Sequence, residues 1–386
     1  MQIFNKPNFN FMKYKYVAFG VSALIILIGW SNIFIGKGLN LGIDFAGGTL
    51  IRVMFQDETR TADVRAALSS ANLGTPQIQA IEDEKREFQI RTLITLEGEE
   101  TQEDLEAHEK MGNMVVDALR TEEERSAAAR GLLDLNNLDE TELKLLLEPP
   151  YPDDAETMSR AILGSRVEVK MFTDFNQLKT EAGLDDEAVA YIQGKTFLSK
   201  LIVLSKESVG PQIGKELRVR ATQAAVWALI GMLIYIGLRF RFAFGVSAVL
   251  TLIHDVMFTV GIFSLTNREL NLPVIAAIMT IIGYSLNDTI VIFDRVRDNI
   301  KFLRKLKFES LLDASINQTL SRTVITSGTT FLTVVALFLF GGSVINDFAF
   351  TIMIGVVVGT YSSIYQSCSL LYFWNKFFKP KKGMGK

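Results

Sequence analysis

The 386-residue sequence has almost none of the residues from which disulfide frameworks and soft-metal sites are built. Its one cysteine, Cys368, lies in an apolar run, so neither a disulfide within the chain nor a Cys-based metal site can form. The two histidines, His108 and His254, are too few for a histidine cluster. The sequence also has no Ser-His-Asp or His-Glu-x-x-His arrangement. We therefore expect no enzyme and no cofactor.

Charged residues are scarce in several long stretches, and this scarcity says more than the net charge of −3. Most of the Lys, Arg, Asp and Glu residues lie between positions 52 and 220. A charge at the centre of a bilayer costs about 2.5 kcal/mol or more, so membrane proteins keep charges out of their spans. The segregation predicts a polytopic α-helical membrane protein.

Six apolar runs are near the ~20 residues that a helix needs to cross a bilayer. They lie at 16–36, 221–238, 243–265, 272–293, 324–340 and 348–373. The first run could be mistaken for a signal peptide, whose apolar part has about 7–15 residues. It is longer than that, and no small-x-small cleavage pattern follows it directly. We therefore expect six retained transmembrane helices.

Lysine and arginine predict the orientation, because short cytoplasmic loops are enriched in both. Basic residues gather in the tails 1–15 and 375–386 and in the loops after the second and fourth runs. With six spans these four segments fall on one side, and the short loops on the other side contain only Arg268. We therefore expect both tails to be cytoplasmic and the segment 37–220 to be an external, periplasmic domain.

The external segment predicts an α+β domain. Strands are expected at 39–55, 77–81, 87–94, 166–172 and 200–205, a helix at 61–71, and a turn at 83–85. A β-α-β-β-α-β ferredoxin-like module fits these pieces. The region 97–163 is rich in Glu, Ala, Arg and Leu and predicts a charged helical insertion with a solvated surface. Basic residues do not cluster with aromatic ones, so we expect no nucleic-acid binding.

Polar groups interrupt the apolar runs after residue 250. They are His254 and Asp255 in the third run, Tyr284, Asn287 and Asp288 in the fourth, Asp294 and Arg295 near its end, and Arg322, Thr326, Thr329 and Thr330 at the start of the fifth. Ionisable groups inside a membrane are costly, and they suggest an ion path or proton relay with a partner nearby.

Asp288 and Arg322 are the natural pair, because the connection between the fourth and fifth runs returns them to a similar depth. Arginine favours the charged carboxylate and burial favours the neutral acid, so movement could switch the group. A static ion pair that fixes helix packing explains the same residues equally well.

The neighbouring polar residues also allow two interpretations. Tyr284, Thr326, Thr329 and Thr330 could hold a water chain or make ordinary interhelical hydrogen bonds. Asp255 could belong to a relay or be a hydrogen-bonded packing residue. We expect His254 to be a packed neutral imidazole rather than a ligand.

One glycine-rich motif imitates a nucleotide site. The segment 42–49 (GIDFAGGT) has the glycine spacing of a phosphate loop, but Gly48 occupies the lysine position. Without a lysine for the β- and γ-phosphates, and on the outer face of the membrane, it cannot bind a nucleotide there.

These motifs carry a family resemblance. The segments 42–49, 209–214, 285–299, 315–330 and 340–365 closely resemble the SecD/SecF family of protein-export membrane proteins, and the last three resemble its SecF branch. The motif residues outside the relay are Gly42, Asp44, Gly47, Gly48, Gly210, Pro211, Asp294 and Arg295. The segment 97–163 makes the external domain longer than is usual in that family.

The resemblance implies a proton-driven subunit of the resistance-nodulation-division superfamily in the bacterial inner membrane. It implies SecD as a partner, together with the SecYEG channel, YidC, SecA and exported preproteins. The implied activity uses the proton motive force to promote preprotein translocation after the SecA-driven stage. The resemblance also places Asp288 and Arg322 in the proton pathway, which favours the relay over the static pair. Two alternative hypotheses are an exporter of small molecules or lipids and a non-transporting scaffold that only stabilises the export channel.

Overall fold

The computed structural model describes residues 7–71, 76–81, 86–92, 102–239 and 242–378. The chain divides into two compact units, one formed by Met1–Asp44 with Leu217–Lys386 and the other by Phe45–Glu216. We call them the helical unit and the α+β unit. The predicted turn at 83–85 lies outside the described residues, as do the ends of the two predicted tails.

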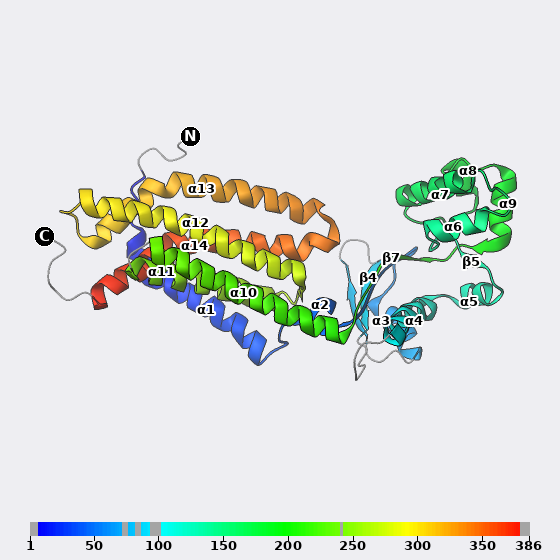
Figure 1. Cartoon of the computed structure of the whole chain (residues 1–386), viewed down its shortest axis with the longest axis horizontal. Helices are drawn as coiled ribbons and strands as arrows, with labels where there is room; N and C mark the ends of the chain where they lie inside the picture. Colours follow the sequence, from blue (N-terminus) through cyan, green and yellow to red (C-terminus); the bar gives the residue numbers. More distant parts are fainter. Residues whose placement is uncertain (1–6, 72–75, 82–85, 93–101, 240–241, 379–386) are drawn as a thin grey trace. The chain divides into compact units, whose positions relative to one another are not determined.

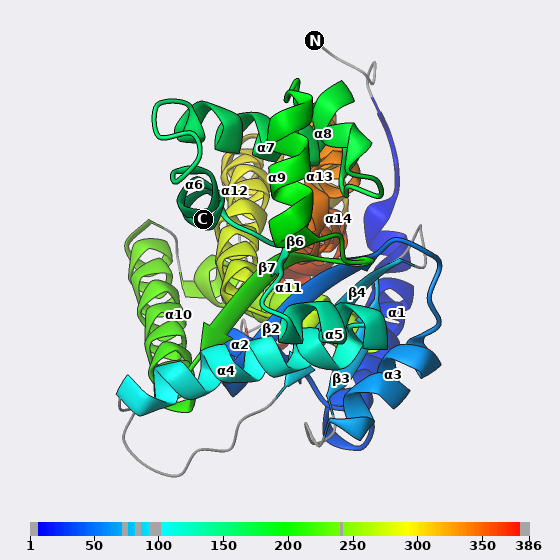
Figure 2. The same ribbon diagram turned by 90° about the vertical axis from the view of Figure 1, so that its right-hand side faces the viewer.

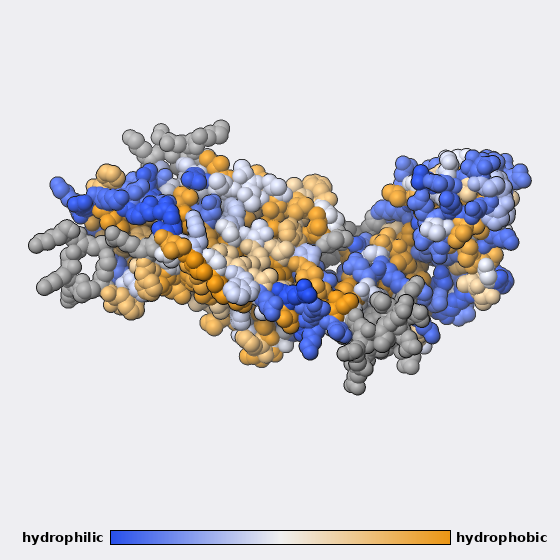
Figure 3. All heavy atoms as spheres, viewed as in Figure 1, coloured by the Kyte–Doolittle hydropathy of each residue, from blue (hydrophilic) through white to orange (hydrophobic). Residues whose placement is uncertain are grey.

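Six helices of the described residues are long and apolar enough to cross a membrane, which fits the prediction of a polytopic helical membrane protein. They are α1 (Lys15–Phe34), α10 (Pro211–Arg239), α11 (Phe242–Leu265), α12 (Leu272–Phe302), α13 (Phe308–Phe340) and α14 (Gly342–Phe378). Residues 211–216 of α10 belong to the α+β unit, and otherwise these helices belong to the helical unit (Figure 1). Hydrophobic side chains cover much of the visible surface of this unit (Figure 3).

Several helices extend beyond the predicted spans. Helix α12 continues nine residues beyond 293, and α13 begins at Phe308 rather than 324. Arg295, Arg297 and Lys301 therefore lie on the last turns of α12 and not in a loop. Apolar run length missed these turns because they are amphipathic. They are held together by polar contacts such as Asn299 Nδ2 to Ser315 Oγ, at 2.9 Å.

Helix α14 is the central element of the helical unit, because it packs against α11, α12 and α13. Small residues bring it close to α12: a Cβ on Gly359 would lie 3.2 Å from Ser285 Cβ. The residues 341–347, which separate the fifth and sixth predicted runs, are mostly helical because α14 begins at Gly342. At this end Arg268 donates to Asp347 Oδ1 at 2.6 Å and lies 4.2 Å from the Phe350 ring centroid.

The described part of the N-terminal tail is bound to α13 and is not free. Phe9 N–H donates to Asn317 Oδ1 at 2.9 Å, and Met12 N–H donates to Asp313 Oδ1 at 2.9 Å. Lys15 forms an ion pair with Glu309 at 2.5 Å. These contacts hold the start of α1 against the start of α13.

The α+β unit contains a four-stranded sheet with every neighbouring pair antiparallel, in the order β3-β4-β2-β7. Its strands are β2 (Gly48–Phe55), β3 (Gln77–Ala80), β4 (Glu87–Thr92) and β7 (Leu201–Val209). Helices α3 (Thr61–Ser70) and α4 (Gln102–Leu119) share one apolar core with the sheet and so cover the same face. Figure 2 shows both helices beside the strands.

A helical subdomain with its own core interrupts the chain between α4 and β7. It is built from α6 (Glu140–Leu147), α7 (Ala155–Val169), α8 (Asn176–Thr180) and α9 (Asp186–Lys195). The bounds predicted for the insertion, 97–163, were wrong: α4 packs on the sheet, whereas the subdomain core runs from Leu135 to Ile192. The strand predicted at 166–172 was also wrong, because α7 continues to Val169.

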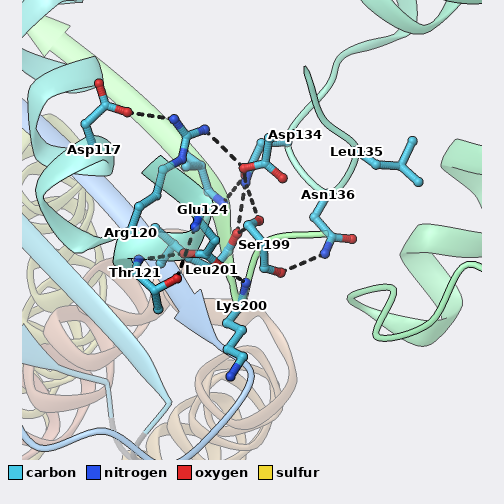
Figure 4. A network of polar contacts seen from close by, with 12 residues as sticks. Asp117, Arg120, Thr121, Glu124, Asp134, Leu135, Asn136, Ser199, Lys200 and Leu201 are labelled. Atoms are coloured by element: carbon cyan, nitrogen blue, oxygen red, sulfur yellow. Dashed lines mark hydrogen bonds and ion pairs between the residues drawn. The ribbon is translucent and has the colours of Figure 1, made fainter. Parts of the chain in front are cut away.

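Buried polar groups join the helical subdomain to the sheet where two chain segments run side by side (Figure 4). Strand β5 (Leu133–Asp134) pairs in parallel with β6 (Thr196–Phe197). The Asn136 side chain donates to the carbonyls of Phe172 and Ser199, each at 2.9 Å. Glu124, between α4 and the subdomain, accepts the Lys200 N–H at 2.6 Å. The charged run at 121–125 is therefore partly structural, since Thr121 and Glu124 form the capping box of α5 (Glu122–Ala129).

Arg166 shows how this junction binds a charge away from solvent. Its Nη1 donates to the carbonyl oxygens of Leu135, Asn136 and Leu138 at 2.8–3.1 Å. Desolvation lowers the pKa of Arg166 from its usual value, although the carboxylates of Asp134 and Asp139 oppose this shift. A guanidinium remains charged under such conditions, so its hydrogen bonds fix the loop that follows β5.

Replacing Gly29 with alanine should destabilise the helical unit. A Cβ at Gly29 would lie 2.5–2.8 Å from backbone atoms of Gly261, so α1 and α11 would have to move apart. We expect a cost of about 1–3 kcal/mol, measured by reversible denaturation of the purified chain in detergent. Gly20→Ala on the same helix is the control, because a Cβ at Gly20 meets nothing within 4 Å. Equal stability of the two variants would contradict close packing at Gly29.

Candidate functional site

The glycine motif positions an aspartate at the start of α12. Strand β1 (Asn40–Leu41) pairs in parallel with β8 (Glu269–Leu270), and the Gly42 N–H donates to the Leu270 carbonyl at 2.8 Å. A Cβ at Gly42 would lie 3.1 Å from that oxygen, which explains the glycine. Asp44, in α2 (Ile43–Ala46), then accepts the Leu272 N–H at 2.8 Å. Its carboxylate thus faces the positive end of the α12 dipole.

The other motif glycines have conformational reasons. Gly47 and Gly48 have φ values of 75° and 110°, which side-chain-bearing residues rarely adopt. They turn the chain from α2 into β2. Gly210 follows β7, and its carbonyl accepts the Gly214 N–H at 2.9 Å as α10 begins at Pro211. A proline is favourable at a helix start because its missing N–H has no partner there.

Asp288 lies inside the bundle of α12, α13 and α14. Asp288 is 4% exposed, and its Oδ2 atom accepts a hydrogen bond from Ser327 Oγ at 3.3 Å. Ser327 on α13 accepts in turn from Thr360 Oγ1 on α14, at 2.7 Å. The carboxyl group of Asp288 is therefore connected to two neighbouring helices through hydroxyl groups.

Arg322 does not form the ion pair with Asp288 that the sequence suggested. Within the described residues no ion pair or hydrogen bond joins the two side chains, and Arg322 is exposed on α13. Its positive charge still acts on Asp288 electrostatically. Arg322 precedes Ser327 by five residues and thus lies more than one turn away from it. The structure therefore joins Asp288 to α13 through a serine and leaves the arginine at a distance.

The threonines of α13 do not make interhelical hydrogen bonds. Thr326, Thr329 and Thr330 each donate to carbonyl oxygens of their own helix at 2.9–3.0 Å. Tyr284 packs in an apolar cluster, and its buried hydroxyl has no partner among the described residues. Asn287 is exposed on α12. These five positions do not converge on Asp288.

Asp255 forms a second buried polar cluster, between α11, α12 and α14. The residue has no exposed surface. Its Oδ1 lies 2.9 Å from His254 Nδ1, and its Oδ2 accepts from Ser285 Oγ and, at 2.8 Å, from Ser362 Oγ. A carboxylate buried away from water needs such donors. Here Ser285 lies on α12, Ser362 lies on α14, and His254 is the neighbour of Asp255 on α11.

Asp294 and Arg295 have surface positions. Asp294 forms ion pairs with Arg297 at 2.9 Å and with Arg239 of α10 at 3.5 Å, whereas Arg295 is exposed. Partly exposed pairs of this kind contribute little energy, about 0–1 kcal/mol. They lie at the ends of α10 and α12, away from the buried clusters.

The sequence did not single out the serines and Thr360 that bind the two carboxylates. Ser285, Ser327, Ser362 and Thr360 are small residues in apolar runs, where hydroxyls more often pair with their own helix. A usable signal was present for one of them, since Ser285 precedes Asp288 by three residues and shares its face of α12.

Two family models match the chain. The model of the C-terminal part of the SecD/SecF protein export membrane proteins covers residues 192–377, which includes both buried clusters. The model of the SecD/SecF GG motif covers residues 33–58, which includes Asp44. The protein translocase subunit SecF of Koribacter versatilis is 37% identical over 98% of this chain and 94% of its own length. The chain belongs to the SecD/SecF family of protein translocase subunits.

Other relatives agree. SecF of Desulfurispirillum indicum is 35% identical over 96% of this chain and 93% of its own length. The crystal structure of SecDF from Thermus thermophilus, a translocon-associated membrane protein, superposes with a TM-score of 0.66 at 31% identity. The match includes 96% of this chain but only 39% of the SecDF chain. Family membership and the six apolar helices support a multi-pass protein of the bacterial inner membrane.

Replacing Asp44 with alanine should weaken the start of α12. The Leu272 N–H would lose its acceptor, and we expect a cost of about 0.5–2 kcal/mol together with faster hydrogen exchange at Leu272. Asp44→Asn retains an acceptor oxygen and should cost less. Hydrogen exchange of the purified chain measures both variants. Unchanged exchange at Leu272 in Asp44→Ala would contradict this role of Asp44, because the N-cap residue Asn271 accepts the Val274 N–H and not that of Leu272.

Proposed function

We propose that this chain is the SecF-type half of a proton-driven unit that promotes preprotein translocation together with SecD. The single observation that carries the proposal is Asp288: a buried carboxyl group at the meeting of three helices, held by a hydroxyl and influenced by an arginine that does not bind it. Such a group can gain and lose a proton without breaking a fixed ion pair.

The arrangement supports a mechanism based on the Asp288 charge. When Asp288 is ionised, it attracts Arg322 and accepts from Ser327; once protonated, it no longer attracts the arginine. Because Ser327 is also bound to Thr360, the change reaches α14, which packs on three other helices. One proton crossing 100 mV provides about 2.3 kcal/mol, enough to shift a two-state equilibrium tens-fold.

The orientation proposed is that both termini lie in the cytoplasm. The basic residues Lys15, Arg239, Arg297 and Lys301 lie at the helix ends that face this side in a six-span arrangement, which supports it. The α+β unit then lies in the periplasm, between the first and second spans. Its strand order β3-β4-β2-β7 is the one expected for a ferredoxin-like β-α-β-β-α-β module, which supports that fold.

The partners proposed are SecD, the SecYEG channel, YidC, SecA and exported preproteins, with the proton motive force acting after the SecA-driven stage. SecD is the best supported partner, because the name SecDF indicates that both halves are joined in one relative. This relative, the SecDF of Thermus thermophilus, is 50% identical over 47% of this chain. The scaffold alternative would retain the partners and make the buried carboxyl structural.

Replacing Asp288 with asparagine should abolish the part of export that depends on the proton gradient. Asparagine keeps the size and an acceptor for Ser327 but cannot titrate. The measurement is preprotein export into vesicles that contain SecD with either chain, with and without an imposed gradient. We expect the gradient to stimulate export in vesicles with the wild-type chain and not in vesicles with the Asp288→Asn variant.

Asp298→Asn is the matched control, because it makes the same chemical change on the same helix near its end. It should retain the gradient response. Copurification with SecD tests assembly of each variant. An assembled Asp288→Asn complex with normal gradient-dependent export would reject the proton-carrier role and favour the scaffold.

Arg322 should tolerate lysine better than glutamine. Because its guanidinium makes no bidentate contact with Asp288, what acts on the carboxylate is the positive charge, which lysine retains. In the same assay we expect Arg322→Lys to keep most of the gradient response and Arg322→Gln to lose it. Equal loss in both variants would mean that guanidinium geometry, and not charge, is required.

A further inference from the structure

The pair His254 and Asp255 is a second acid–base arrangement that the proposed function does not use. His254 Nδ1 lies 2.9 Å from Asp255 Oδ1, inside a bundle where Asp255 has no exposed surface. The other carboxyl oxygen accepts hydroxyl donors from α12 and α14. These three contacts give the carboxylate a donor on each side, so an ionised Asp255 is compatible with its burial.

The same contacts determine the state of the imidazole. Because a carboxylate oxygen only accepts, the proton of a neutral His254 resides on Nδ1, and Nε2 carries the lone pair. Nε2 is buried and pairs with no group of the described residues. A proton taken from a hydronium ion at Nε2 leaves a water molecule and gives an imidazolium, whose charge the Asp255 carboxylate balances. Release of the proton to water restores the neutral ring and the hydronium ion. No other reactant is needed.

Helices α12 and α14 each carry hydroxyl groups close to both this pair and Asp288. Ser285 binds Asp255 and lies three residues before Asp288 on α12. On α14, Ser362 binds Asp255, and Thr360, two residues earlier, donates to Ser327, which holds Asp288. The segment Gly359–Ser363 of α14 therefore contacts both buried carboxyl groups, directly or through one serine.

We propose that His254 and Asp255 form a second proton-exchange site, with the imidazole Nε2 as the accepting atom, and that the segment Gly359–Ser363 couples it to Asp288. The role in export rests on the proposed function, whereas the titration of His254 does not. The ligand of this site is the proton, donated by a hydronium ion.

The groups facing the pair are few. From α14 the Tyr361 ring lies 6.5 Å from the His254 ring between centroids, and its hydroxyl donates to the Ala18 carbonyl of α1 at 2.7 Å. On α12 the titratable residues next to Ser285 in the sequence are Tyr284 and Asp288. From α1 comes Ser22, which donates to Tyr361 at 3.2 Å. Among the described residues His254 is the titratable group that acts electrostatically on Asp255.

Histidine-selective labelling tests the site directly, because the sequence has two histidines. The chain, carrying His108→Gln and labelled with ¹³C,¹⁵N-histidine, is reconstituted with SecD in vesicles and titrated by solid-state NMR. We expect His254 to be the neutral Nδ1–H tautomer at high pH and to convert to imidazolium on acidification. Asp255→Asn should lose the imidazolium signal at the pH where the unmodified site shows it.

Three variants separate the site from a packing role. His254→Asn keeps an N–H for Asp255 without a titrating nitrogen, so gradient-dependent export should fall several-fold while SecD still copurifies. Ser362→Ala removes one donor and leaves the carboxyl group, so the His254 midpoint should shift by about half a pH unit or more. Asp288→Asn should also shift that midpoint if the segment Gly359–Ser363 couples the two sites.

A His254 that keeps one protonation state from about pH 5 to 8 would overturn the second site, even if Asp288→Asn loses the gradient response. An unchanged midpoint in both Ser362→Ala and Asp288→Asn would overturn the coupling. If His254 titrates and its midpoint shifts while export ignores the gradient, the second site stands and the proposed function fails. The two proposals therefore fail separately.

Discussion

A carboxylate buried among apolar helices must be given hydrogen-bond donors or a counter-charge, and in this chain hydroxyl groups provide most of the donors. Ser327 donates to Asp288, whereas Ser285 and Ser362 donate to Asp255. Hydroxyl donors stabilise the ionised form less than an arginine would, which is why we propose that Asp288 can change its protonation state. The helix packing around α14 follows from the same need, because these short side chains reach only when the helices are close.

The close approach of the helices has its own requirement in small residues. Gly359 lets α14 approach Ser285 on α12, and Gly29 lets α1 approach the backbone of Gly261 on α11. In lipid, small residues at such contacts allow van der Waals packing and interhelical hydrogen bonds to form together. Asp44 anchors the other end of α12 by accepting the Leu272 N–H. Packing, capping and the buried polar clusters thus act on the same helix.

The sequence predicted the six helices because charge avoids apolar spans, and it predicted β3 and β4 from alternation. The strand predicted at 39–55 includes β2, but α2 interrupts it at Ile43–Ala46. Run length could not find the amphipathic ends of α12 and α13, whose polar residues pair with one another. The sequence also singled out Asp288, Arg322 and Asp255 as unusual intramembrane groups. It could not show that Asp288 binds Ser327 rather than Arg322, because the rotation of α13 decides which residue faces α12. The helical subdomain was misplaced because composition does not reveal which core a helix joins.

We propose that the carboxyl group of Asp288 changes its protonation state during export. Infrared difference spectroscopy of vesicles containing the chain with SecD, recorded while a preprotein is exported under a proton gradient, can detect this change. We expect a protonated-carboxyl band that rises and decays with export and is missing in Asp288→Asn. Export that proceeds under the gradient with no change in that band would rule out this role of Asp288.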